Sequence, residues 1–366
     1  MSKFKVIQLL PELNIGGVER GTKDFSKVLV ERGHDSLVIS NGGIFEKDII
    51  EDGGKHINLP IHKKSLFSIR YASDLRDIYL SEKPDIVHVR SRMPAWINYF
   101  AYKKLSHKPL LVSTFHGLYS TPLYSQVMSK VDHIIAISKT VKDYIQGTYK
   151  VPNEKITVIP RGCDPEIFNK NPVEETWIKK WYEEFPQTQD KIILTMPTRI
   201  SKWKGVDSFI DLVSLLDDDN YHAFIVGPTA KSKKSYLKQL QNKISNYGIE
   251  DKITITGSRN DISNIYKISD FVFNLSIKPE PFGRTTIEAI SSGSKVIGWN
   301  HGGTKEILEE LYPDGLVELD NIDDLAEKVI NLSNMTNNMP KENIFTSERM
   351  TNQTISLYQD LLAKRL

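Results

Sequence analysis

Short, almost continuously apolar segments alternate with helical patterns along the whole 366-residue chain. Strands that are buried on both faces have this composition, because helices cover both sides of a parallel sheet. Alternation with helices predicts parallel βαβ units and therefore the α/β fold class. The expected strands are residues 4–10, 35–40, 85–89, 110–115, 133–138, 156–160, 191–197, 222–227, 252–257, 270–276 and 295–299.

The alternating pattern breaks once, between residues 163 and 189, where three prolines accompany a short charged helix with two tryptophans. A chain of this length is too long for one ordinary core and suits two domains of ~150–200 residues. We predict two doubly wound, Rossmann-like domains, 1–165 and 190–344, which face each other across a cleft and are joined by a linker at 166–189. The final helix, 345–366, could pack on either domain, including back on the first.

Composition narrows the class of protein further. Apolar residues make up 39% and charged residues 26%, as in soluble globular proteins. The single cysteine, Cys163, excludes an intrachain disulfide and a zinc site built on cysteines. The first apolar run is too short for a signal peptide, and none approaches the ~20 residues that span a bilayer. We therefore expect a cytoplasmic protein.

Charge is distributed unevenly along the chain. The net charge is +2, but residues 1–165 carry +7 and the remainder −5. A basic first half could face an anionic acceptor or membrane surface, although such a split also arises by chance.

In open parallel sheets, ligands bind outside the carboxyl ends of the strands. Gly16 and Gly17 follow the first strand and open a helix, where free N–H groups suit a phosphate; a plain turn is the simpler alternative. Arg199 and Lys204 follow the first strand of the second domain. Two cations at a strand end predict a clamp for a diphosphate, with solvated surface charges as the alternative.

Two carboxylates, Glu280 and Glu288, follow the strand at 270–276. Glu288 is the only charge in TTIEAISSG, and a carboxylate among small and apolar residues is costly unless it is hydrogen-bonded. Sugar hydroxyls are natural partners, as for the acidic residue that holds a ribose in Rossmann sites. The alternative is a glutamate on a helix surface.

Basic residues also end the strands of the first domain. His116 follows 110–115 and could bond a sugar hydroxyl or a phosphate, or be held by backbone groups alone. Arg90, Arg92 and Arg161 are candidates for binding an anionic acceptor, or are plain surface charges.

Asp217, Asp218 and Asp219 resemble an acidic metal-binding motif, but a solvated turn explains them more simply. We expect no essential metal and no cofactor.

These motifs together resemble a known family. EPFGRTTIEAISSG, residues 280–293, resembles the Glu-x7-Glu signature of the retaining family 4 glycosyltransferases, which have the GT-B fold. The resemblance extends over nearly the whole chain, through GGVER, FHG, AISK, VIPRGCDPEIF, PTRISKWKG and NHGGTKEI in the family's order. SRMPAW, IPRG and EPFGR are most similar to bacterial lipopolysaccharide and surface-polysaccharide members.

The resemblance implies roles for these residues. Arg199 and Lys204 bind the donor diphosphate, Glu288 holds the nucleotide ribose and Glu280 contacts the donor sugar. The implied catalytic residues are Glu280, Arg199, Lys204 and His116, and His116 contacts the donor sugar. The other implied donor contacts are Gly16, Gly17, Phe282, Gly283 and Arg284. Two positions depart from many relatives, which have asparagine in place of Arg161 and an apolar residue in place of Arg284.

The implied activity is transfer of a sugar, with retained configuration, from a nucleotide-sugar to a glycan or lipid-linked acceptor. UDP is the expected nucleotide, from its frequency in the family. Peripheral contact with the inner face of an anionic membrane is a further expectation, from aromatic and basic stretches such as 96–108. Alternatives are a GT-B epimerase, a phosphorylase, and a catalytically inactive nucleotide-sugar-binding scaffold. Binding of nucleic acid is not expected, because the basic half lacks the interleaved aromatic residues expected of a platform for base stacking.

Overall fold

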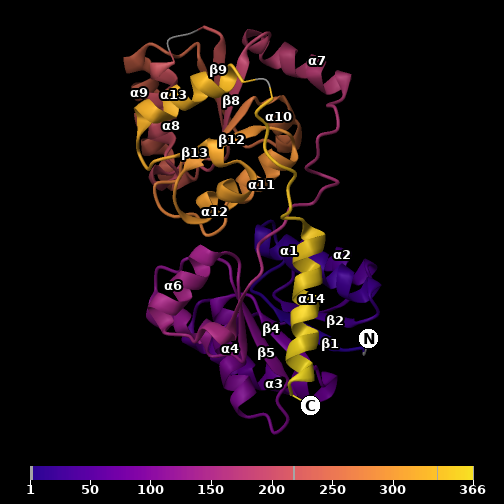
Figure 1. Ribbon diagram of the computed structural model, residues 1–366. Helices are drawn as coiled ribbons and strands as arrows, with labels where there is room; N and C mark the ends of the chain where they lie inside the picture. Colours follow the sequence, from indigo (N-terminus) through magenta and orange to yellow (C-terminus); the bar gives the residue numbers. More distant parts are fainter. Residues whose placement is uncertain (1–2, 217–218, 336, 366) are drawn as a thin grey trace. The chain divides into compact units, whose positions relative to one another are not determined.

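The computed structural model describes residues 3–216, 219–335 and 337–365. The chain divides into two compact units, Met1–Pro160 with Met350–Leu366, and Arg161–Arg349. Each unit contains one parallel sheet with helices between its strands (Figure 1). The predicted α/β class and the two Rossmann-like parallel sheets are confirmed.

The first unit holds a seven-stranded sheet in the order β3-β2-β1-β4-β5-β6-β7, and all of its strand pairs are parallel. The strand order reverses between β1 and β4, which is where a doubly wound sheet opens a crevice for ligands. The elements of this unit are β1 (Lys5–Leu9), α1 (Gly17–Glu31), β2 (Asp35–Ser40), α2 (Glu46–Glu51), β3 (Lys55–Asn58), α3 (Tyr71–Glu82), β4 (Ile86–Val89), α4 (Arg92–Lys103), β5 (Leu110–Phe115), α5 (Pro122–Ser125), β6 (His133–Ala136), α6 (Lys139–Tyr149), β7 (Ile156–Val158) and α14 (Ser347–Ala363).

The second unit repeats this plan with a six-stranded sheet in the order β10-β9-β8-β11-β12-β13. Its order reverses between β8 and β11. The elements are α7 (Glu175–Glu184), β8 (Ile192–Pro197), α8 (Val206–Leu215), β9 (Tyr221–Val226), α9 (Lys234–Tyr247), β10 (Ile253–Gly257), α10 (Ile262–Ile268), β11 (Phe271–Asn274), α11 (Arg284–Ser291), β12 (Lys295–Trp299), α12 (Gly302–Leu311), β13 (Leu316–Val317) and α13 (Ile322–Ser333).

Two observed strands, β3 and β13, are absent from the expected set. Both lie at the edges of their sheets. No residue of β3 is fully buried, and β13 has only two residues. Neither strand therefore carries the apolar run by which a central strand is recognised.

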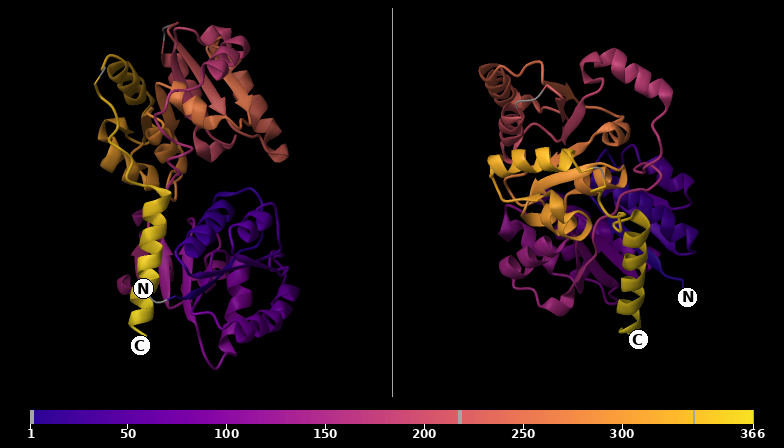
Figure 2. Two further views of the ribbon diagram at one scale, coloured as in Figure 1. Left: turned by 90° about the vertical axis from the view of Figure 1, so that its right-hand side faces the viewer. Right: turned by 45° about the horizontal axis from the view of Figure 1, so that its top comes forward.

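The C-terminal helix α14 packs on the sheet of the first unit. Ile355 and Tyr358 join its core beside residues of β1, β4, β5 and α1. The Tyr358 hydroxyl also bonds Nδ1 of His88 on β4, 2.6 Å away. In both views of Figure 2, α14 runs alongside this unit. The last helix therefore completes the core of the first unit.

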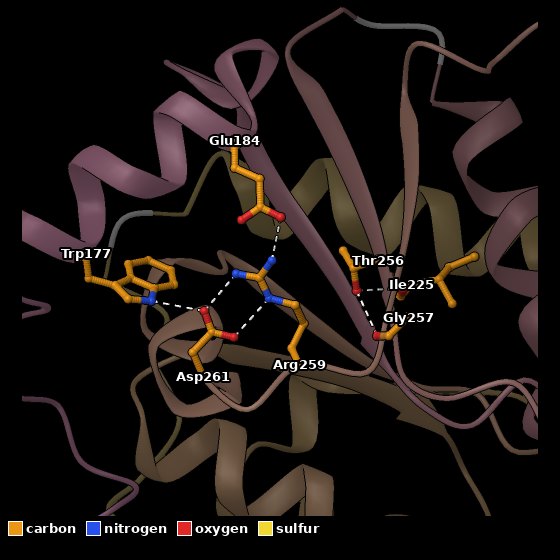
Figure 3. A network of polar contacts seen from close by, with 7 residues as sticks. All are labelled: Trp177, Glu184, Ile225, Thr256, Gly257, Arg259 and Asp261. Atoms are coloured by element: carbon orange, nitrogen blue, oxygen red, sulfur yellow. Dashed lines mark hydrogen bonds and ion pairs between the residues drawn. The ribbon is translucent and has the colours of Figure 1, made fainter.

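Helix α7 packs on the second unit. Trp181 joins the core of this unit with Phe224 of β9. A polar network holds the same helix (Figure 3): Arg259 donates two hydrogen bonds to Asp261, at 2.9 and 2.8 Å, and a third to Glu184 at 2.7 Å. The Trp177 indole N–H donates to Asp261 at 3.0 Å. Burial of aromatic rings and a charge-assisted network thus fix α7 in place.

Candidate functional site

The loops that follow β8 and β11, where the strand order reverses, bring two predicted donor residues together. Lys204 Nζ forms an ion pair with Oε1 of Glu280. The Ser276 hydroxyl donates to the same oxygen at 2.6 Å. Glu280 is only 9% exposed, so its carboxylate is held by charge-assisted bonds in a largely dry position.

The two loops that carry this pair are locked to each other. Gly205 has a φ of +75°, and a Cβ at this position would overlap the carbonyl oxygen of Leu275. The Ile277 N–H donates to the Trp203 carbonyl at 2.8 Å. Lys204 Nζ lies 4.3 Å from the centre of the Trp203 ring. Close backbone contact therefore fixes the position of the Lys204 backbone, from which the side chain extends to Glu280.

The side chain of Arg199 lies in a different environment from that of Lys204, although both residues follow β8. Its side chain is exposed. Among the residues that the structure describes, no carboxylate lies within ion-pair distance of its guanidinium. Of the two predicted clamp cations, one is neutralised within the protein and the other is open to solvent.

Glu288 lies on α11 one turn after Arg284, and their side chains form an ion pair at 3.1 Å. Gly283 caps the helix with a φ of +99°, a conformation that favours glycine. Phe282 is buried, with its ring 5.8 Å from that of Phe345 in an edge-to-face contact. The Phe282 side chain therefore anchors the loop, and its backbone is the part left for a ligand.

In the first unit, Gly16 precedes the first residue of α1, Gly17. The Glu19 carboxylate lies so close to Gly16 that a Cβ there would overlap it. An internal carboxylate thus lies beside the helix start at which the sequence predicts a phosphate. A bound phosphate would require the Glu19 side chain to turn away.

His116 directly follows β5 and is partly buried. Its backbone N–H donates to the Tyr119 hydroxyl at 3.3 Å. Arg92 begins α4, and its guanidinium lies 4.8 Å from the centre of the same Tyr119 ring. The structure therefore brings Arg92 and the His116 loop together at the carboxyl edge of the first sheet.

Arg90 is placed differently from Arg92. It is 6% exposed, and its guanidinium lies 5.5 Å from the centre of the Phe25 ring. Burial lowers the pKa of Arg90 to about 10, partly offset by the Tyr358 phenol. Arg161 precedes Gly162, which has no room for a side chain beside the backbone of Thr346.

Several residues around these side chains escaped the sequence analysis. Ser276 holds Glu280, and the ring of His301 bonds the Ser276 carbonyl at 2.7 Å. Thr121 and Ser125 bond Arg92 in the first unit. Hydroxyl groups are frequent in loops, and only the position of Ser276, two residues after the end of β11, could have singled it out.

Of the three consecutive aspartates, Asp217 and Asp218 lie outside the described residues. Asp219 forms an ion pair with Lys252 at 3.1 Å. Within the described ranges, no three His, Cys, Asp or Glu side chains are grouped closely enough to hold a metal ion.

Two family models match the chain. Residues 15–167 match "Glycosyltransferase Family 4", and residues 178–347 match "Glycosyl transferases group 1". The crystal structure of a glycosyltransferase from Rickettsia africae is 30% identical, with a TM-score of 0.85 and 99% of each chain covered.

Two further proteins resemble the chain over nearly its whole length. The crystal structure of Anabaena HepE in complex with UDP and glucose has a TM-score of 0.78 at 20% identity, and covers 98% of this chain and 100% of that one. N-acetyl-alpha-D-glucosaminyl L-malate synthase of Bacillus anthracis is 24% identical, with 95% of each chain covered. The two sheets and the structural matches agree with the predicted GT-B fold.

Proposed function

Because this chain belongs to glycosyltransferase family 4, a retaining family, we propose that it transfers a sugar from a UDP-sugar to a glycan or lipid-linked glycan. The pathway that we propose is the synthesis of lipopolysaccharide or another surface polysaccharide. The observation that carries the donor half is the contact between Lys204 and Glu280 where the strand order of the second sheet reverses. UDP in the similar HepE structure supports the choice of nucleotide.

The donor contacts follow from the geometry of the second unit. Arg199, open to solvent, and Lys204 hold the diphosphate, and Lys204 exchanges Glu280 for phosphate as the donor enters. Ser276 keeps Glu280 in place during this exchange, because its hydroxyl binds the same carboxylate oxygen. Glu280 then accepts hydrogen bonds from the hydroxyls of the donor sugar.

The start of α11 completes the donor site. Glu288 accepts from the ribose hydroxyls, and its ion pair with Arg284 orients the carboxylate. The backbone at Phe282 and Gly283 supports the sugar. His116, Gly16 and Gly17 remain predicted contacts of the sugar, the phosphates or the acceptor.

The proposed reaction places the acceptor hydroxyl on the same face of the sugar that the nucleotide leaves. The acceptor oxygen forms a bond to the anomeric carbon as the bond from that carbon to the phosphate oxygen breaks. The departing phosphate takes the proton of the acceptor hydroxyl. Arg199 and Lys204 stabilise the negative charge that develops on the leaving diphosphate.

Release of UDP tests this proposal. Wild type is incubated with a panel of UDP-sugars and with undecaprenyl diphosphate-linked and lipopolysaccharide-core acceptors, alongside Lys204→Ala and Glu280→Gln. We expect acceptor-dependent release of UDP that falls at least 100-fold in Lys204→Ala, because this variant lacks a cation that stabilises the leaving diphosphate. We expect it to fall in Glu280→Gln as well, because the variant holds the hydroxyls of the donor sugar less well. Binding of UDP-sugar without any turnover would instead favour the inactive scaffold. Interconversion of the donor sugar would favour the epimerase.

We propose that the enzyme works at the cytoplasmic face of the membrane, held there by a basic and aromatic surface on α4. Tyr99 lies beneath two cations, Lys103 at 4.5 Å and Lys130 at 5.1 Å from its ring centre. Phe100 is 37% exposed on the same helix, and Leu123 is 82% exposed. No helix among the described residues is long and apolar enough to span a bilayer.

Sedimentation with vesicles tests the membrane proposal. We expect binding to phosphatidylglycerol vesicles that is weakened by salt and by the double change Lys103→Glu and Lys130→Glu. Absence of binding to anionic vesicles at low salt would refute it. The name of the relative from B. anthracis includes L-malate and no glycan. The chemical class of the acceptor is therefore tested in a separate experiment from the donor.

A further inference from the structure

Arg92 is held in one position by four neighbours in the first unit. Its guanidinium lies 4.8 Å from the centre of the Tyr119 ring and 5.4 Å from that of Tyr124. Its Nη1 donates to the Thr121 hydroxyl at 3.1 Å and to the Ser125 hydroxyl at 3.4 Å. A long side chain with this many contacts loses its rotational freedom on folding, so a ligand that binds it need not order it again.

These contacts leave one edge of the guanidinium unused. Both hydrogen bonds come from Nη1. Among the described residues, Nε and Nη2 of Arg92 have no hydrogen-bond acceptor, and no carboxylate lies within ion-pair distance. Nε–H and Nη2–H point in parallel, and this pair of donors matches the two oxygens of a carboxylate or a phosphate.

The surroundings of Arg92 favour an anion. Arg92 is the first residue of α4, where the helix dipole places partial positive charge. The first turn of α4 has no acidic residue, and no side chain caps it. Arg90, two residues earlier, is 6% exposed and also has no carboxylate partner within the described part of the chain. The Arg92 guanidinium and the start of α4 therefore lie together with no acidic side chain of that first turn to balance them.

The position of Arg92 in the sheet indicates that this anion belongs to a ligand. Arg92 follows β4, and the strand order of the first unit reverses between β1 and β4. Doubly wound sheets bind their ligands at this reversal. The loop that carries His116 lies beside Arg92, because Tyr119 contacts both residues.

We propose that the free edge of Arg92 binds an oxyanion of the acceptor, so that the acceptor is a sugar bearing a carboxylate or a phosphate. The inference rests on the proposed function, because it assigns the acceptor to the first unit.

Ligand-detected NMR titration of the whole protein, saturated with UDP, tests this inference. The probes are glucuronic acid, glucose 6-phosphate and glucose, which separate a carboxylate, a phosphate and a neutral sugar. We expect at least one anionic probe to bind at least 10-fold more tightly than glucose. Arg92→Gln should weaken that probe about 10- to 100-fold, the usual worth of a charge-assisted bidentate contact. Arg92→Lys should retain part of the binding, because it keeps the charge.

A matched control variant separates the loss of a direct contact with Arg92 from the loss of one positive charge on the protein. Arg32→Gln removes the same charge from the residue that follows the C-terminal end of α1. This variant should leave binding of the anionic probe unchanged. Equal losses in Arg92→Gln and Arg32→Gln would overturn the inference, as would an affinity for glucose equal to that for both anions. Thermal unfolding of each variant shows that it is folded.

The donor and acceptor proposals fail separately in this experiment. UDP binding without preference for an anionic probe overturns only the acceptor inference. Anion binding through Arg92 without UDP binding overturns the donor proposal and leaves the Arg92 site in place.

Discussion

Gly205 lies where the two donor loops of the second unit meet, and replacing it tests how those loops are held. In Gly205→Ala, the new Cβ would overlap the carbonyl oxygen of Leu275, and the backbone would keep a φ of +75°. The left-handed conformation costs a residue with a side chain about 1–2 kcal/mol. Overlap with backbone adds about 1–3 kcal/mol, because a carbonyl cannot rotate away as a flexible side chain can. We therefore expect a loss of about 3 kcal/mol in the free energy of unfolding.

Gly248→Ala is the matched control. Gly248 also has a left-handed φ, +66°, but nothing lies within 4 Å of the position that its Cβ would take. Only the conformational cost of about 1–2 kcal/mol should remain.

Urea unfolding followed by tryptophan fluorescence reports on the second unit, since four of the five tryptophans lie in it. We expect the midpoint to fall by roughly 1–2 M for Gly205→Ala, and by half of that or less for the control. Equal midpoints for the two variants would refute the close approach of the loops.

Two further changes test the packing of each unit. The hydrogen bonds of Arg259 lower the pKa of Asp261, so this carboxylate stabilises the fold above its unfolded pKa of about 3.9 and loses that effect as pH falls through its folded pKa. Asp261→Asn should therefore lower the urea midpoint at pH 7 and have a smaller effect at pH 3; a constant difference would contradict the network. Tyr358→Phe removes the buried hydroxyl that bonds His88, and should cost about 1–3 kcal/mol in thermal or urea unfolding, whereas an unchanged midpoint would show that this bond adds nothing.

The central strands were predictable because their chemistry is local. A strand buried on both faces must be apolar along its whole length, and the apolar runs at 110–115 and 222–227 match β5 and β9 closely. The edge strands β3 and β13 lack this signal, because no residue of β3 is fully buried and β13 has only two residues. Whether these two strands pair depends on their neighbours in the sheet, and a local sequence pattern carries no information about those neighbours.

The site was predictable as a set of positions but not as a set of partners. The carboxyl ends of the strands identify Lys204 and Glu280, because parallel strands place their ends at one edge. Sequence spacing does not reveal that these two side chains pair, or that Ser276 joins them. The same limit applies to Arg90 and Arg92, two residues apart: one is buried under Phe25, while the other is held by hydroxyl and tyrosine groups of a distant loop.

Stabilisation by nucleotide tests the proposed donor site without the acceptor or the donor sugar. UDP, GDP and ADP are titrated into wild type, Glu288→Gln and the exposed-helix control Glu309→Gln, and thermal unfolding is followed. We expect UDP to raise the unfolding temperature of wild type and of Glu309→Gln, and Glu288→Gln to lose most of this shift. If none of the nucleotides shifts the transition of wild type, or if Glu288→Gln responds as fully as the control, the proposed donor site is wrong.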